Sequence, residues 1–196
     1  MGQPLSAQSL ATLFTEARSY NDWSATPITD AEIRAIQAHA MFGPTAANTN
    51  PARYVWAVSE EGKARVCAHM SGSNRAKSLK ASAVVVVAYD LDFPDQMPVL
   101  FPHAPDAKNW FGDLTTREEP ALRNSSLQGA YLLLAARALG WDTGPMSGFD
   151  NAALDKDLFA GTNIKSNFIV AIGKGTTANL FPRLPRLPFE QANTIL

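Results

Sequence analysis

Residues 83–89 read AVVVVAY, an uninterrupted apolar run in the middle of the chain. Its residues do not alternate between apolar and polar, so a strand formed here would be covered on both faces. The run is far shorter than the ~20 residues that a helix needs to span a bilayer. It therefore predicts the central strand of a sheet that lies between layers of helices.

Helical and strand patterns lie on both sides of this run. Thr29 and Glu32 form a capping box, and an apolar face continues to Met41 before Gly43-Pro44 ends the helix. Apolar spacing indicates further helices, and β-branched and aromatic content indicates further strands. The predicted helices are 5–17, 60–70, 74–79, 121–139 (Gly140 at C′) and 151–159 (capped by Asp150), and the predicted strands are 53–59 and 167–172.

Two segments lack such patterns. Residues 92–120, the lid segment, contain five prolines together with bulky aromatics, which favours a packed lid over a disordered loop. Residues 181–196, the C-terminal arm, begin with three closely spaced prolines and are expected to be extended. We predict one domain over residues 1–196, of the α+β class with a three-layer α/β arrangement, in which helices flank a short mixed sheet.

Composition excludes several classes of function. The 196 residues are 46% hydrophobic and 18% charged with a formal charge of -1, so the chain is globular and nucleic acid is not an expected partner. The single Cys67 allows no internal disulfide and fits a reducing, cytoplasmic location. Gly2 and Ser6 match the myristoylation pattern, but no polybasic stretch follows, so we expect no membrane association.

The side chains show no catalytic machinery of their own. His39, His69 and His103 are scattered, and none has metal-ligand spacing with Cys, Asp or Glu, so no metal site is predicted. GPMSG at 144–148 has the wrong spacing for a nucleophile elbow, and phosphate-binding glycine loops are missing. An enzyme of this composition would take its reactivity from a bound cofactor.

Four separated segments point to one cofactor. They are ARSYNDW (17–23), GPTAANTNPARYV (43–55) with SNRAK (73–77), GWDTGPMSGFD (140–150) and FPRLPR (181–186). In this order and spacing the chain resembles the nitroreductase family of FMN-dependent oxidoreductases from about residue 10 to residue 188. Within that family it looks most like the malonic semialdehyde reductase branch, which is tied to pyrimidine degradation. The resemblance implies a nitroreductase-like fold and a homodimer.

The resemblance assigns cations and polar groups to FMN. Arg18, Ser19, Arg183 and Arg186 would bind the phosphate, as guanidinium forks and a hydroxyl can. Each arginine taken alone could equally be a surface residue. Asn74 and Lys77 lie one helical turn apart and share a face. By resemblance they contact the flavin ring edge, with Lys77 near N1 and the C2 carbonyl, although a solvated helix turn would show the same pattern.

Two loops would cover the flavin. In the family, the turn before the first strand crosses the dimer interface to the partner's flavin, which assigns cofactor contacts to Pro44, Thr45, Ala46 and Asn48. An ordinary wide turn would explain the prolines of this segment but not its lack of bulky side chains. From the other side, Pro145, Met146, Ser147 and Gly148 would contact the ring, with the backbone at Ser147 and Gly148 near N5. No side chain is expected to be catalytic.

The sequence also departs from the family pattern. Asn21, here included among the cofactor-binding residues, stands where a basic residue is common, and Ser147 stands where many members have Glu. Asn50-Pro51-Ala52 replaces Gln-Pro-Trp, which reshapes the pocket. Trp110 and Phe111 of the lid segment are the expected walls of a small substrate pocket.

The predicted function is ping-pong hydride transfer from NADH or NADPH through flavin N5. The preferred acceptor, on resemblance alone, is malonic semialdehyde, which would be reduced to 3-hydroxypropionate. A broad nitro- or quinone reductase is the first alternative. A flavin-binding module without turnover and a purely structural dimer are alternatives of other classes.

Overall fold

The computed structural model describes residues 2–196 and contains a five-stranded sheet. Strand β3 pairs with β2 on one side and β5 on the other, and β5 also pairs with β4 and β1. All these pairs are antiparallel, so the α+β class is confirmed but the expected mixed sheet is wrong. The strands are β1 (Trp23–Ser24), β2 (Ala52–Ala57), β3 (Ala83–Asp90), β4 (Asp142–Met146) and β5 (Ile164–Gly175).

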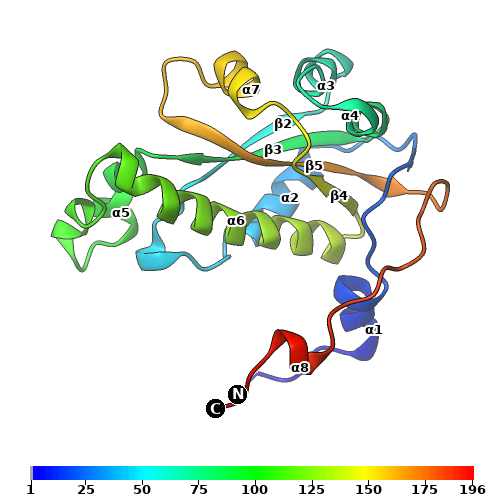
Figure 1. The fold of residues 1–196 in the computed structure, drawn as a ribbon, viewed down its shortest axis with the longest axis horizontal. Coiled ribbons are helices and arrows are strands. Elements are labelled where there is room, and N and C mark those ends of the chain that lie inside the picture. The colour runs from blue at the N-terminus through cyan, green and yellow to red at the C-terminus, as the bar shows by residue number, and fades with distance from the viewer. Residues whose placement is uncertain (1) are drawn as a thin grey trace.

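Helices cover both faces of the sheet (Figure 1). Helices α2 and α6 lie on one face, and α3, α4 and α7 lie on the other. Within residues 2–196, no helix combines the length and apolar character needed to cross a membrane. The α-helices are α1 (Ala7–Leu10), α2 (Asp30–Ala40), α3 (Glu60–Cys67), α4 (Gly72–Leu79), α5 (Met97–Leu100), α6 (Leu114–Ala138), α7 (Asn151–Leu158) and α8 (Phe189–Ala192).

Strand β3 separates two hydrophobic cores, as its apolar run predicts. Val84 and Val86 pack with the core under α3 and α7, whereas Val85 and Val87 pack with the core under α2 and α6. All four valines are fully buried. Alternate residues of a strand point to opposite faces, so an unbroken apolar run is what a two-sided core requires.

Helix α6 begins earlier than the sequence indicates. We expected a start after Pro120, but the helix begins at Leu114, and Pro120 lies inside it. The Asp113 side chain accepts a hydrogen bond from the Thr116 N–H at 3.0 Å and caps the new start. The last seven residues of the lid segment therefore belong to α6, and the rest form short helical turns. Gly140 has φ +77° and ends the helix as predicted.

Strand β4 was missed, because its Gly144-Pro145 pair disfavours a strand on local grounds. It pairs with β5 over residues 142–146, and β5 is longer than predicted. Proline is tolerated because β4 has a single ladder partner in the sheet and thus lies at its border. This strand determines where the residues of the site lie.

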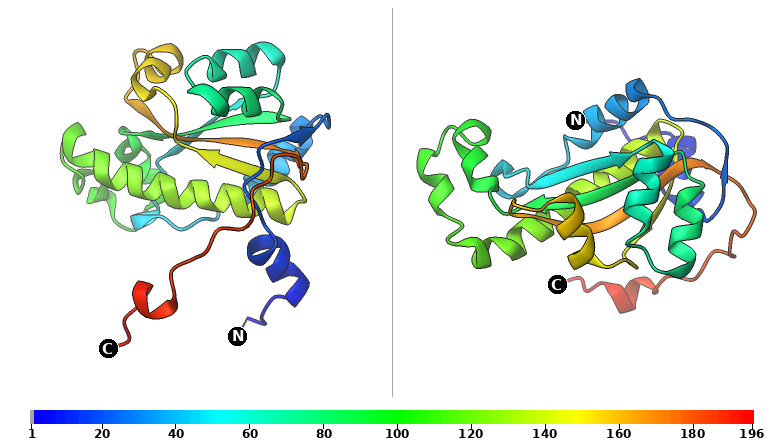
Figure 2. Two further views of the ribbon diagram at one scale, coloured as in Figure 1. Left: turned by 45° about the vertical axis from the view of Figure 1, so that its right-hand side comes forward. Right: turned by 90° about the horizontal axis from the view of Figure 1, so that it is seen from above.

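Both ends of the chain leave the body of the molecule beyond the C-terminal end of α6 (Figures 1 and 2). The N-terminal helix is α1 continued by a π-helical turn at Ala11–Thr15. The C-terminal arm has no helix or strand up to Pro188 and then forms the unpredicted α8. Several large apolar side chains of the two ends are exposed: Leu5, Phe14, Phe181, Leu184, Leu187 and Phe189.

Candidate functional site

The N-terminal segment that carries Arg18, Ser19 and Asn21 runs beside β4. Ser19 forms a parallel bridge with Thr143, and the Tyr20 N–H donates to the Thr143 carbonyl at 3.2 Å. The unpredicted strand β4 thus fixes three predicted cofactor-binding residues at the border of the sheet.

The C-terminal arm is tied to this segment by two arginines. The Arg18 guanidinium donates to the carbonyl of Phe181, and Arg183 Nη2 donates to the carbonyl of Ala17 at 3.1 Å. Each arginine therefore holds the backbone of the other segment. Residues more than 160 positions apart in the sequence meet here.

A cavity of about 410 Å³ lies between the two segments and the end of α6. Four arginines line it, and none of its lining residues is acidic. Three of them, Arg18, Arg183 and Arg186, were predicted, whereas Arg137 on α6 was not. The lining residues are Phe14, Ala17, Arg18, Ser19, Asn21, Arg137, Phe181, Pro182, Arg183, Leu184 and Arg186. This arginine cavity is suited to a compact anion.

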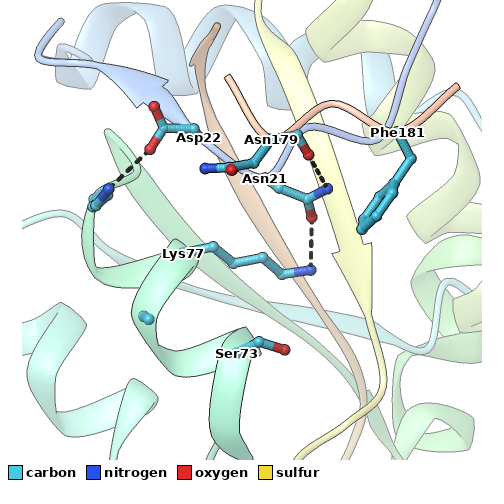
Figure 3. Close-up of a pocket in the computed structure, with 8 residues that line it drawn as sticks. Asn21, Asp22, Ser73, Lys77, Asn179 and Phe181 are labelled. Atoms are coloured by element: carbon cyan, nitrogen blue, oxygen red, sulfur yellow. Dashed lines mark hydrogen bonds and ion pairs between the residues drawn. The ribbon is translucent and has the colours of Figure 1, made fainter. Parts of the chain in front are cut away.

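A second cavity of about 330 Å³ adjoins it and shares Asn21 and Phe181 (Figure 3). Lys77 Nζ donates to Asn21 Oδ1 at 3.2 Å, and Asn21 Nδ2 donates to the Asn179 carbonyl at 3.3 Å. Burial lowers the pKa of Lys77. Through these two hydrogen bonds Asn21 connects α4 to Asn179, just before the C-terminal arm. This is the role of Asn21 in a position where a basic residue is common.

Gly148 lies beside the start of α4. Its carbonyl accepts from Asn74 Nδ2 at 3.2 Å and from Ser71 Oγ at 3.0 Å, which brings together two residues that the resemblance assigned to the flavin separately. A Cβ at position 148 would lie 2.5 Å from Asn74 Nδ2, so a larger residue here would displace the Asn74 side chain. Met146 is buried against Ser78, so only its backbone is available to a ligand.

The remaining residues of this loop differ in their access. Ser147 is exposed, and Pro145 lies within β4 opposite Val170. The two adjoining cavities form an elongated site, with the arginines at one end and Lys77 with hydrogen-bonding groups at the other. Asn74 and residues 145–148 line neither cavity.

Comparison with known proteins identifies the family of this chain. The model of the nitroreductase family matches residues 15–174. The chain belongs to the nitroreductase family. A protein of Caulobacter sp. (strain K31), provisionally named NADH dehydrogenase/NAD(P)H nitroreductase, is 60% identical over 192 residues, 98% of each chain.

Solved structures share the fold. A provisionally named nitroreductase from Bacillus subtilis has a TM-score of 0.87 and 23% identity, covering 97% of this chain and 100% of its own. Another from Exiguobacterium sibiricum, solved in complex with FMN, has a TM-score of 0.86 and 21% identity over the full length of both chains. The nitroreductase-like fold expected from the sequence is confirmed.

The loop of residues 43–51 lies elsewhere in this nitroreductase. It packs along the middle of α6: the Ala46 N–H donates to Asn124 Oδ1 at 2.7 Å, and Gly43 lies directly against Tyr131. Asn124 and Arg137 are thirteen residues apart on the helix, roughly 20 Å. Within one chain, Pro44, Thr45, Ala46 and Asn48 therefore do not line the arginine cavity.

The loop also has a local reason for its composition. Asn48 Nδ2 donates to the Leu100 carbonyl at 2.8 Å, and Thr45 Oγ1 accepts from the Asn50 N–H at 3.2 Å. Ala47, Asn48 and Asn50 all have positive φ, a conformation that asparagine tolerates better than most residues. Some of its small polar residues are thus needed to shape the loop itself.

The lid segment lies at the opposite end of α6 from the arginine cavity (Figure 1). Phe111 packs edge-on against buried Phe93, with ring centroids 4.8 Å apart. Trp110 is 60% exposed and contacts Phe101, with centroids 6.0 Å apart. Neither predicted substrate-pocket residue lines the two cavities of the same chain.

Sequence reasoning missed Arg137, Asn179 and Phe181 as residues of the site. Arg137 carried a weak signal, because it is a cation at the end of the apolar stretch AYLLLAARA. Its relation to the arm depends on how α6 packs, which the sequence pattern does not reveal.

Proposed function

We propose that this protein is an FMN-dependent NAD(P)H oxidoreductase that works as a homodimer. The observation that carries the proposal is the arginine cavity, which is lined by four cations and no carboxylate. It adjoins the second cavity, which Lys77 lines. Further support comes from the Caulobacter relative, named for NAD(P)H, and from the Exiguobacterium structure, which contains FMN.

The residues present fit the chemical groups of FMN. The phosphate is a dianion, and Arg18, Ser19, Arg183 and Arg186 offer it guanidinium forks and a hydroxyl. The flavin ring edge needs donors, which Asn74 and Lys77 can supply. The backbone of Ser147 and Gly148 would approach the ring, and the absence of a side chain at 148 leaves the Asn74 amide in place beside it. When bound, FMN supplies hydride transfer between NAD(P)H and the acceptor.

Two features support a homodimer. The loop of residues 43–51 and the lid segment lie away from the cavities of their own chain, so a second copy is needed to bring them to a cofactor. In addition, α6 and its C-cap expose Leu122, Leu127, Tyr131 and Leu139, and Met41 and Phe42 after α2 are also exposed. An apolar surface of this kind is typical of an interface.

Malonic semialdehyde is the acceptor we propose first, on the sequence resemblance described above. Lys77 puts a positive charge at the ring end of the site, which favours a small carboxylate-bearing aldehyde. A broad nitro- or quinone reductase is the second candidate, and the name of the Caulobacter relative favours it.

The first experiment is the visible absorbance spectrum of the purified protein, before and after incubation with FMN. Oxidation of NADH and of NADPH is then measured with malonic semialdehyde, a nitroaromatic and a quinone. A kcat/KM for the aldehyde above those for the nitroaromatic and the quinone supports the first candidate. A kcat/KM for the nitroaromatic and the quinone that equals or exceeds that for the aldehyde supports the second. Flavin without turnover would indicate a binding module, and a protein that cannot take up FMN would refute the proposal.

A further inference from the structure

Arg137 lies in the last turn of α6, half-buried beside the arginine cavity. Its Nη1 donates to the carbonyl of Leu13 at 3.2 Å. Its Nε is buried and has no hydrogen-bond partner within residues 2–196. A buried donor without a partner is costly, so it points to a group that the protein chain itself does not provide.

The charge of this cluster is also uncompensated. Arg18 donates to the carbonyl of Phe181, Arg183 to that of Ala17, and Arg186 to those of Leu184 and Pro185. With Arg137 on Leu13, all four arginines thus donate to neutral backbone carbonyls. In the part of the chain that the structure describes, none of the four forms a salt bridge.

Burial lowers the pKa of Arg137, and the nearby carboxylate of Asp142 only partly opposes this effect. The charged guanidinium is thus desolvated without a contacting counter-ion. An anion in the cavity would supply both the missing charge and an acceptor for Nε.

We propose that Arg137 is a cofactor-binding residue that contacts the phosphate of FMN from α6 and selects flavin mononucleotide over riboflavin. The inference rests on the proposed function. It adds a third element of the fold to the phosphate site, beside the N-terminal segment and the C-terminal arm. A planar fork suits a phosphate better than a lysine ammonium does.

A purely structural role is the competing explanation, since the bond to Leu13 ties α6 to the N-terminal helix. The two roles differ in what they do to riboflavin, which has the same ring system but no phosphate. Loss of a structural tie would weaken FMN and riboflavin alike. Loss of a phosphate contact would weaken FMN alone.

In the test, flavin-free protein is titrated with FMN and with riboflavin. The quenching of flavin fluorescence reports binding. Arg137→Gln should weaken FMN binding about tenfold or more and change riboflavin binding less than about twofold. Arg137→Lys should recover part of the loss. Arg34→Gln, on α2 where exposed Arg34 pairs with Asp30 away from both cavities, is the control and should change neither.

An unchanged FMN affinity in Arg137→Gln, or equal weakening of both ligands, would overturn the inference. If Arg137→Gln does not fold, Arg137→Lys decides, because a several-fold lower ratio of FMN to riboflavin affinity is expected and an unchanged ratio rejects the contact. Failure of the unaltered protein to bind FMN at all would instead refute the proposed function.

Discussion

Lys77 on α4 and Asn21 in the N-terminal segment meet through a 3.2 Å hydrogen bond from Lys77 Nζ to Asn21 Oδ1. Asn21 in turn donates to the Asn179 carbonyl, so one asparagine connects a helix of the body to the start of the C-terminal arm. The bond orients the ammonium toward the second cavity (Figure 3). Its positive charge is partly desolvated there, which strengthens its effect on a ligand.

Replacing Lys77 by Met should therefore lower the reduction potential of bound FMN. A cation near the ring stabilises the reduced, anionic form, and we expect a decrease of about 30 mV, equivalent to about 1.4 kcal/mol for two electrons. The measurement is a redox titration of the holoprotein. Lys156→Met, an exposed change on α7, is the control. Equal potentials for Lys77→Met and the unaltered protein would remove Lys77 from the flavin site.

Replacing Arg18 or Arg183 by Ala should weaken FMN binding by about one to two decades each. Each change removes a charge-assisted contact of roughly 1.5–3 kcal/mol to the phosphate. It also releases the arm, since these two guanidinium groups hold Phe181 and Ala17. Equilibrium titration gives the affinity, and limited proteolysis of the arm reports the second effect. Full FMN affinity in both variants would show that the phosphate binds elsewhere.

Elements whose structure is determined by their own local sequence were predicted correctly. The capping box of Thr29 and Glu32 forms as expected, with the Thr29 N–H bound to Glu32 Oε2 at 2.8 Å. The unbroken apolar run of β3 likewise has a single physical explanation. Elements that depend on partners were missed: β4 exists because β5 pairs with it, despite its Gly-Pro sequence.

The residues of the site also divide into those that the sequence predicted and those that only the packing of the chain reveals. Arg18, Arg183 and Arg186 were assigned by the family resemblance of the segments that contain them, and the structure brings them into one cavity. Arg137 belongs to an ordinary amphipathic helix, and only the packing of α6 beside the two chain ends reveals it. The cofactor contacts expected from Thr45 and Asn48 remain predictions, since their test requires the second copy.

The proposed homodimer predicts the effect of a charge on α6. Leu127 is 45% exposed, so Leu127→Glu would cost an isolated chain little. In a dimer with a total interface above about 2,000 Å², the buried charge should promote dissociation. Analytical ultracentrifugation at micromolar concentration measures this, with Leu79→Glu on the opposite helical layer as the control. An unaltered protein that sediments as a monomer while holding FMN would contradict the dimer.

Tyr54 on β2 should make the protein less stable at alkaline pH. Burial raises the pKa of Tyr54 to about 12, against about 10 in an unfolded chain. The unfolded state thus loses its proton first, and the stabilisation present below pH ~10 is lost as the pH rises to ~12. Tyr54→Phe should remove up to about 2 kcal/mol of this decrease. The measurement is the free energy of unfolding in urea, taken across that pH range for the unaltered protein and for Tyr54→Phe. An identical pH dependence of the two proteins would reject the assignment to Tyr54.

The last prediction concerns Trp110 in the lid segment. Its side chain is 60% exposed and touches Phe101, whereas the neighbouring Phe111 is anchored against Phe93. Trp110→Ala should therefore leave the melting temperature nearly unchanged, while Phe111→Ala should lower it through a loss of about 1–3 kcal/mol. If a second copy brings Trp110 over the flavin, the Trp110 variant should lower kcat/KM for a three-carbon aldehyde and raise it for a bulky quinone.

Steady-state kinetics with both acceptors, on both variants, separate the two roles. Phe111→Ala serves as the matched control for damage to the lid, since it should affect both acceptors alike. A parallel loss of activity with both acceptors in Trp110→Ala, together with a lower melting temperature, would show that Trp110 only holds the lid together. Opposite changes for the small and the bulky acceptor, at an unchanged melting temperature, would identify Trp110 as the residue that limits substrate size.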